Sequence, residues 1–214
     1  MTEVERKPRR ALAVAAVAVL PFLLLAGGCG DLTSGGFGEL EVEMAADSLS
    51  GDGAVSSSMQ ASSYASSLIE GTLTAQVRVF VRRGVLDWEE VTDGAQTVVL
   101  TLGEAGSGLV ARDEFPAGRY DRVLIVFRRV EVEIVRGLVV DGDTIRGRIR
   151  VELEADRQIA IVRLIDLVVR DGERSVLLME MRASRWLLRV DRLRRVVEAV
   201  DFRELFRVRV REAR

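Results

Sequence analysis

Residues 114–135 read EFPAGRYDRVLIVFRRVEVEIV, and this stretch decides the fold. The apolar phase runs through Val123, Ile125 and Phe127, and then through Val130, Val132 and Ile134. A period of two residues is typical of a β-strand that turns one face to a core. The apolar phase slips by one residue at Arg128-Arg129, and a flat ladder cannot absorb such a slip without exchanging its faces. We therefore predict a β-bulge here, or a strand that passes from one sheet to another.

The same alternation recurs along most of the chain after residue 38. The segments that carry it are 39–45, 72–83, 96–102, 145–155, 163–181 and 206–212. Asp141-Gly142 and Asp171-Gly172 are hairpin signals between such segments. Residues 158–169 also fit a helical period, but their β-branched side chains and the turn that follows favour a strand.

A helical period is evident only near the end of the chain, where Ser184 is a candidate N-cap. The side chains that would share one face of this helix are Trp186, Leu187, Val190 and Leu193. Short strands separated by turns, with one late helix, predict a mainly β fold: an antiparallel β-sandwich or a partly open barrel with one C-terminal helix. We expect residues 39–214 to form this single domain, with a Ser-rich loop at 46–70.

Composition excludes several classes of function. Of the 214 residues, 48% are hydrophobic and 30% are charged, so a packed core is expected. The formal net charge of −2 provides no general basic field, and we do not expect nucleic acid binding. The chain has no histidine, which excludes Ser-His-Asp and Cys-His catalysis. Its only lysine is Lys7, so lysine Schiff-base chemistry is not expected in the folded domain.

The first thirty residues have the three parts of a secretory signal. A basic start is followed by an uncharged apolar stretch at 11–28, which reads ALAVAAVAVLPFLLLAGG. This stretch is at the short limit for a transmembrane helix, and it contains Pro21. Both properties favour a transient signal over a permanent membrane span.

Ala26-Gly27-Gly28-Cys29, with Leu25 just upstream, resembles the lipobox of bacterial lipoproteins. In that family the cysteine sulfur receives a diacylglyceryl group, and the signal is cut just before the cysteine. The resemblance implies a lipoprotein signal peptide at 1–28, a lipidation site at Cys29 and attachment to the membrane through that lipid. The Gly-rich residues 29–38 would then form a flexible tether. One departure is that leucine is commonest three positions before the cysteine, where this chain has alanine.

Three other interpretations of the N-terminus stay open. The apolar stretch could remain as an uncleaved membrane anchor. The protein could be secreted with a free Cys29, although an unpaired cysteine is a liability in an oxidising compartment. Arg9-Arg10 could also mark a twin-arginine export signal, although arginine pairs are common in basic N-termini.

Between Gly71 and about Asp191 the chain resembles a bacterial envelope-lipoprotein sandwich family that is itself a domain of unknown function. The residues that carry the resemblance are Gly71-Thr72-Leu73-Thr74, Phe115-Pro116-Ala117-Gly118-Arg119-Tyr120 and Trp186-Leu187. The P-A-G-x-Y element also occurs in other prealbumin-like sandwiches, where a turn feeds a tyrosine into the core. The resemblance implies a β-sandwich and an envelope address, and it implies no reaction.

Two acidic groups are candidate ligand sites. Asp141-Gly142-Asp143-Thr144 places two carboxylates one residue apart and could contribute to a calcium site, or it could be a plain hairpin turn. Asp87, Glu89 and Glu90 flank Trp88, an arrangement that could bind carbohydrate or protein, or could be a solvated connection.

Basic side chains give a further candidate, a sheet face for anionic glycans formed by Arg78, Arg82, Arg146, Arg148 and Arg150. Glutamates on neighbouring strands could neutralise such a face through cross-strand pairs. The Ser-rich segment around Tyr64 could be a binding loop or a surface linker. We assign no catalytic, cofactor or metal residue.

Taken together, these patterns predict a lipid-anchored cell-envelope protein that acts as a non-enzymatic binding or structural module. Its partner would be an envelope protein or a glycan, and in a bacterium with two membranes it would sit in the outer membrane, facing the periplasm or the surface. The alternative is a carboxylate-dependent, glycan-directed hydrolase. A cleft with two or more buried acids of raised pKa would favour the hydrolase, and a flat or aromatic-lined exposed patch would favour the binding module.

Overall fold

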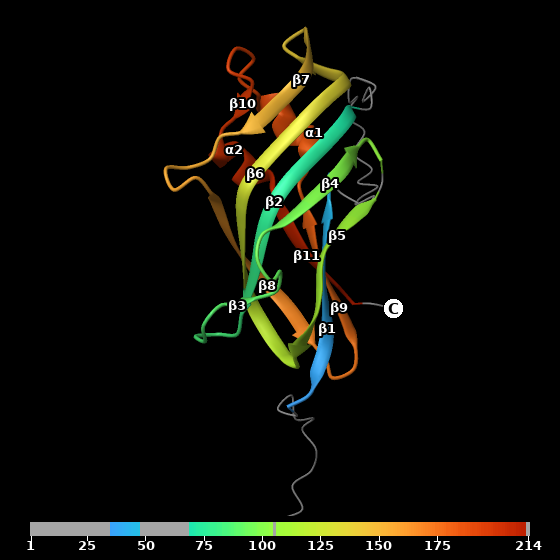
Figure 1. Cartoon of the computed structure of the whole chain (residues 1–214), viewed down its shortest axis with the longest axis vertical. Coiled ribbons are helices and arrows are strands. Elements are labelled where there is room, and N and C mark those ends of the chain that lie inside the picture. The colour runs from blue at the N-terminus through green and yellow to red at the C-terminus, as the bar shows by residue number, and fades with distance from the viewer. Residues whose placement is uncertain (1–34, 48–68, 105, 213–214) are drawn as a thin grey trace, which may run out of the picture. The chain divides into compact units, whose positions relative to one another are not determined.

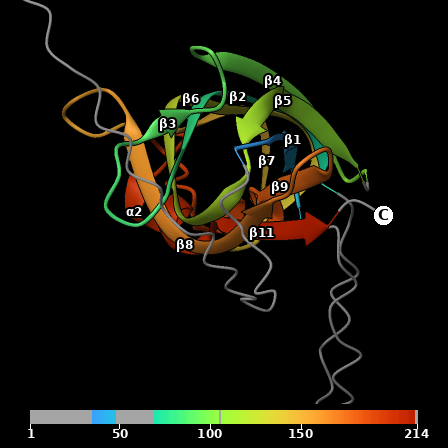
Figure 2. The same cartoon turned by 90° about the horizontal axis from the view of Figure 1, so that it is seen from below.

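The computed structural model describes residues 35–47, 69–104 and 106–212, all within the compact unit Leu32–Arg214. The fold is mainly β, as predicted, and its two sheets face one another without closing into a barrel (Figures 1 and 2). The predictions for the signal peptide, Cys29 and the first part of the tether lie outside the described residues. The same holds for residues 48–68 of the Ser-rich segment, including Tyr64.

The smaller sheet has four strands. Their order is β11 (Arg207–Glu212), β9 (Arg174–Glu180), β1 (Phe37–Ala45) and β5 (Ser107–Pro116). β1 begins two residues inside the predicted tether and lies in the interior of the sheet, antiparallel to β5 and parallel to β9. The alternating segment at 206–212 forms β11 at the edge of this sheet, where its arginines discourage pairing with another chain.

The larger sheet has seven strands. Along its main path the order is β10 (Val196–Val197), β7 (Asp143–Val151), β6 (Gly118–Val140), β2 (Glu70–Arg82) and β3 (Glu89–Glu90). In addition, β4 (Gln96–Leu102) pairs with β2, and β8 (Ile159–Val169) pairs with β6. The preference for a strand at 158–169 is therefore confirmed. The pairing is antiparallel except between β1 and β9 and between β10 and β7, so both sheets are mixed.

The predicted bulge is present in β6. Val77 of β2 lies opposite Phe127 and Gln76 lies opposite Arg129, so Arg128 is the extra residue. The bulge leaves Phe127 and Val130 buried while both arginines are exposed. At the same place β6 changes its neighbour on the side opposite β2. Pairing with β8 ends at Phe127, and pairing with β7 begins at Glu131.

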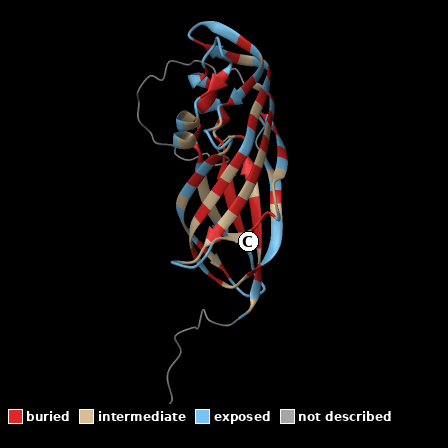
Figure 3. Ribbon diagram, turned by 60° about the vertical axis from the view of Figure 1, so that its left-hand side comes forward, coloured by how far each residue is buried: buried red, intermediate tan, exposed pale blue. Residues whose placement is uncertain are grey.

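The core lies between the inner faces of the two sheets, where bands of buried residues alternate with exposed ones along the strands (Figure 3). Tyr120 is fully buried at the start of β6, and its hydroxyl donates a hydrogen bond to the Pro116 carbonyl oxygen at 2.9 Å. The P-A-G-x-Y segment thus turns the chain and delivers a tyrosine into the core. An aromatic cluster of Phe127, Phe202, Phe206 and Trp186 joins the sheet to the C-terminal helical segment.

Two short α-helices are described, α1 (Ala183–Trp186), which continues into a 3₁₀ turn at Leu187–Arg189, and the C-terminal α2 (Ala199–Leu205). The prediction that Leu193 shares the buried face of a helix capped by Ser184 is wrong. Ser184 lies inside α1, and the chain is already extended at Val190. The Asp191 carboxylate accepts the backbone N–H groups of Leu193 and Arg194, and this turn leaves Leu193 96% exposed. None of the helices in the described ranges is long and apolar enough to cross a membrane.

Candidate functional site

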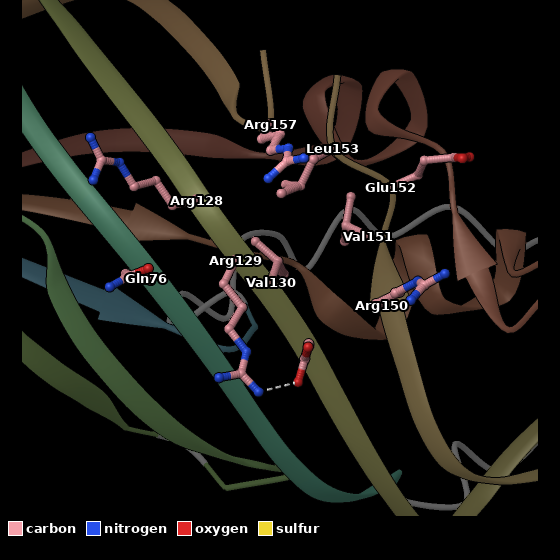
Figure 4. A pocket seen from close by; sticks show the side chains of 10 residues that line it. Gln76, Arg128, Arg129, Val130, Arg150, Val151, Glu152, Leu153 and Arg157 are labelled. Carbon is pink, nitrogen blue, oxygen red and sulfur yellow. Dashed lines mark hydrogen bonds and ion pairs between the residues drawn. The ribbon is translucent and has the colours of Figure 1, made fainter. Parts of the chain in front are cut away.

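An open pocket of about 640 Å³ lies on the larger sheet at the β6 bulge (Figure 4). Its lining comes from β2, β6, the end of β7 and the loop before β8: Gln76, Arg128, Arg129, Val130, Glu131, Arg150, Val151, Glu152, Leu153 and Arg157. The pocket forms where β6 has lost β8 as a neighbour and has not yet gained β7. The bulge therefore determines where the depression lies.

Four arginines line this pocket, and all four are exposed. In Figure 4 they lie on different sides of Val130. Arg129 donates a hydrogen bond to Glu131 at 2.6 Å. Among the described residues, the guanidinium groups of Arg128, Arg150 and Arg157 form no ion pair.

The pKa of Glu131 reflects the positive charges around this pocket. The hydrogen bond from Arg129, together with the positive charges of Arg148 and Arg150, lowers the pKa of Glu131 below its usual range. The second glutamate of the lining, Glu152, accepts a hydrogen bond from Arg194 at 2.7 Å. The site thus already stabilises one carboxylate and keeps further guanidinium donors exposed. Its chemistry is suited to holding an oxyanion, because guanidinium groups bind carboxylate and phosphate oxygens in a fixed fork geometry.

The Asp141-Gly142-Asp143-Thr144 motif forms the turn between β6 and β7. Asp141 and Gly142 have φ values of 49° and 87°, as a tight two-residue hairpin turn requires. Arg192 approaches both carboxylates, with its guanidinium 2.6 Å from Asp143 and 3.8 Å from Asp141. No group of three or more potential metal ligands occurs in the described part of the chain. The motif is therefore a hairpin turn whose acids are paired with an arginine.

The acidic residues around Trp88 are also engaged in local contacts. The Arg82 guanidinium lies 4.9 Å from the centre of a Trp88 ring, and Trp88 is half-buried beneath it. Glu90 accepts a hydrogen bond from Arg78 at 2.8 Å, and that contact lowers the pKa of Glu90. Trp88 and Glu90 are thus packed against arginines of β2, and Glu89 lies 3.5 Å from Arg83.

The five arginines predicted to form a basic sheet face do not act together. Arg78 is paired with Glu90, Arg148 lies 3.7 Å from Glu133, and Arg82 covers Trp88. Only Arg150 belongs to the bulge pocket. Glutamates on neighbouring strands therefore neutralise Arg78 and Arg148, and Arg82 packs on an aromatic ring. This agrees with the alternative that cross-strand glutamates neutralise the basic face.

The buried carboxylates are spread over the smaller sheet. Glu41 is 4% exposed and lies against Arg112 and Arg174, and the fully buried Glu180 lies 3.2 Å from Arg209. Asp47 is the acid with a raised pKa among the described residues; burial raises it, and a hydrogen bond from Ser184 opposes the shift. The structure does not bring these three acids together in the pocket at the bulge.

The sequence indicated part of this pocket and missed the rest. The phase slip at Arg128-Arg129 marked the bulge, and its consequence is that two successive arginines share the outer face. Arg157 gave no recognisable signal, because it comes from the irregular loop between β7 and β8. Only the change of neighbours along β6 brings this loop beside the bulge.

Comparisons of the chain with family models, curated proteins and solved structures found no significant match.

Proposed function

We propose that this protein is a non-enzymatic binding module that is held at the cell envelope by a lipid on Cys29. The observation that carries the binding role is the open pocket at the β6 bulge, with three arginines that form no ion pair among the described residues. The envelope address rests on the basic, apolar and small segments that precede Cys29 and on the Gly-rich stretch that follows it.

Two further features support a binding role over hydrolysis. The buried Glu41 and Glu180 are each in contact with arginines, which favours a structural role for their carboxylates. The single acid with a raised pKa among the described residues, Asp47, is hydrogen-bonded to both the backbone and the side chain of Ser184. A glycosidase needs two carboxyl groups that flank one bond. Glu41, Glu180 and Asp47 lie apart from the open pocket, and the two acids that line it, Glu131 and Glu152, are each hydrogen-bonded to an arginine.

The anchor is tested by labelling with a clickable palmitate analogue in a bacterial host. We expect the wild-type protein to incorporate the label and to fractionate with membranes. Cys29→Ala should lose the label, since Cys29 is the only cysteine of the chain. Ser34→Ala, a change in the same Gly-rich stretch, is the control and should keep the label. Equal labelling of wild type and Cys29→Ala would overturn the proposed anchor.

A further inference from the structure

The pocket at the β6 bulge presents more positive charge than its own acids neutralise. Of its four arginines, Arg129 is paired with Glu131, while the other pocket acid, Glu152, is paired with Arg194 from outside the lining. Arg128, Arg150 and Arg157 are exposed and form no ion pair among the described residues. Their charges are therefore available to a ligand.

Backbone geometry supports a built site at this place. Arg128 is the extra residue of the bulge, and bulges re-aim side chains at sheet positions where pairing stops. Arg157 has a φ of 59°, in the left-handed region that residues other than glycine rarely adopt. Its N–H donates to the Glu154 carbonyl oxygen at 2.8 Å, which closes the turn that holds Arg157 beside the bulge.

Apolar residues of the lining lie at the edge of the core. Val130 is 1% exposed and Val151 is 3% exposed, so they present almost no surface to the pocket, and half-buried Leu153 is the apolar side chain that a ligand can contact. In Figure 4 the arginines lie apart from one another around Val130 and Leu153 and do not converge on one point. A single small anion would meet only some of them. A pocket of about 640 Å³ instead has the size of a small organic molecule.

We propose that the bulge pocket binds an organic phosphate that carries at least two phosphate groups on a compact body. The phosphate oxygens would accept hydrogen bonds from Arg128, Arg150 and Arg157, and the body would lie over Leu153. Such a ligand could be a soluble sugar phosphate or the headgroup of a phosphorylated lipid, since both offer the same chemistry. This inference deepens the binding half of the proposed function and does not depend on lipidation of Cys29.

The test is calorimetric titration of the full chain in detergent with fructose 1,6-bisphosphate, fructose 6-phosphate and inorganic phosphate. We expect the bisphosphate to bind about tenfold or more tightly than either compound with one phosphate, because it engages more guanidinium groups. Affinity should also fall as salt rises, because the arginines are exposed to solvent.

Variants locate the site. Arg128→Gln with Arg157→Gln should weaken bisphosphate binding by about tenfold or more. Arg119→Gln removes one charge and is the matched control for the single variants Arg128→Gln and Arg157→Gln, because Arg119 lies at the start of β6, away from the bulge, in an exposed pair with Asp166. It should change the affinity less than about twofold. Equal weakening by Arg119→Gln, or equal affinity for mono- and bisphosphate, would overturn the proposal.

The source of the ligand is distinguished by repeating the titration with cardiolipin, a lipid with two phosphates, in the detergent micelles. If cardiolipin weakens bisphosphate binding to the wild type, and cardiolipin itself binds less tightly to the Arg128→Gln, Arg157→Gln variant, the pocket binds a lipid headgroup. Bisphosphate binding that cardiolipin leaves unchanged supports the site with a soluble ligand. Loss of labelling at Cys29 has no bearing on these outcomes, so the anchor and the pocket are tested separately.

Discussion

At the scale of single residues, Tyr120 combines a polar group with complete burial. Its hydroxyl donates to the Pro116 carbonyl oxygen, its ring packs edge-on against Phe115, and the Arg83 guanidinium lies 5.1 Å from the ring centre. Burial raises the pKa of the Tyr120 hydroxyl to about 12. The folded state therefore keeps this proton at a pH where the unfolded chain loses it.

We expect Tyr120→Phe to lower the free energy of unfolding by about 1 kcal/mol at neutral pH through loss of the hydrogen bond. In the wild type, the stability linked to the raised pKa is complete below pH of about 10 and is lost as pH rises toward about 12. Its size is roughly 2–3 kcal/mol. The variant should therefore show a shallower loss above about pH 10. Urea unfolding from pH 8 to 11.5 measures both effects.

Few other groups obscure this titration, because the chain has one lysine, Lys7, and one other tyrosine, Tyr64. Tyr64→Phe keeps Tyr120 and serves as the reference for removal of a phenol. An alkaline slope as steep in Tyr120→Phe as in that reference would contradict the assignment of the effect to Tyr120.

At the scale of elements, the bulge in β6 lets one strand serve two neighbours. The half of β6 before the bulge pairs with β8 and the half after it pairs with β7, while β2 pairs with both halves. Because of the extra residue, the apolar side chains both before and after the bulge point into the core. Without it, one half of the strand would turn its apolar residues outward.

Deletion of Arg128 should therefore destabilise the protein by about 4 kcal/mol or more, or prevent folding, because buried residues of one half would lose their place in the core. Arg128→Ala keeps the residue count and should change the free energy of unfolding by less than about 0.5 kcal/mol. Urea denaturation followed by circular dichroism measures the difference. A deletion variant as stable as Arg128→Ala would mean that the ladder does not need the bulge.

Strand alternation and turn chemistry made most elements predictable from the sequence. The bulge, the hairpin turn at Asp141-Gly142 and the strand β8 all follow from local patterns. The position of β1 between β5 and β9 did not follow, since nothing local encodes which distant strands will pair. The helix beginning at Ser184 was predicted too long, because the chain is already extended at Val190 and the Asp191 side chain then forms a separate turn by accepting the backbone N–H groups of Leu193 and Arg194.

The candidate site was predictable only in part for the same reason. Arg128 and Arg129 share the outer face as a direct result of the phase slip, which the sequence contains. Arg150 and Arg157 join them through the pairing of β7 and through a loop conformation with positive φ, and both depend on tertiary structure. Composition also could not separate paired from unpaired arginines, because the partners come from distant strands.

At the scale of the whole molecule, the aromatic cluster connects the end of the chain to the larger sheet. The Phe202 ring of α2 lies 5.2 Å from the ring of Phe127 on β6 and 5.7 Å from Trp186 of α1, in edge-to-face geometry. α2 has only seven residues, too few to be stable alone, so its stability comes from this packing.

We expect Phe202→Ala to lower the free energy of unfolding by about 3–5 kcal/mol, through lost burial and the cavity that remains. The control is Val200→Ala on the same helix, because Val200 is 51% exposed and should cost less than about 1 kcal/mol. Chemical denaturation with both fluorescence and circular dichroism as readouts checks the values. If Phe202→Ala cost no more than Val200→Ala, the cluster would not be what holds the C-terminal segment.

The interior position of β1 determines how the domain bears load. β1 is the first described strand; its ladder to β5 runs from Phe37 to Ala45, and its ladder to β9 runs from Glu39 to Ala45. A force that pulls on the chain ahead of Phe37 along the strand axis acts in shear on both ladders at once, and no single pair of residues can be opened first. β1 is thus held by hydrogen bonds along both of its edges. This arrangement would resist a pulling force at the proposed lipid attachment, which precedes β1 in the chain.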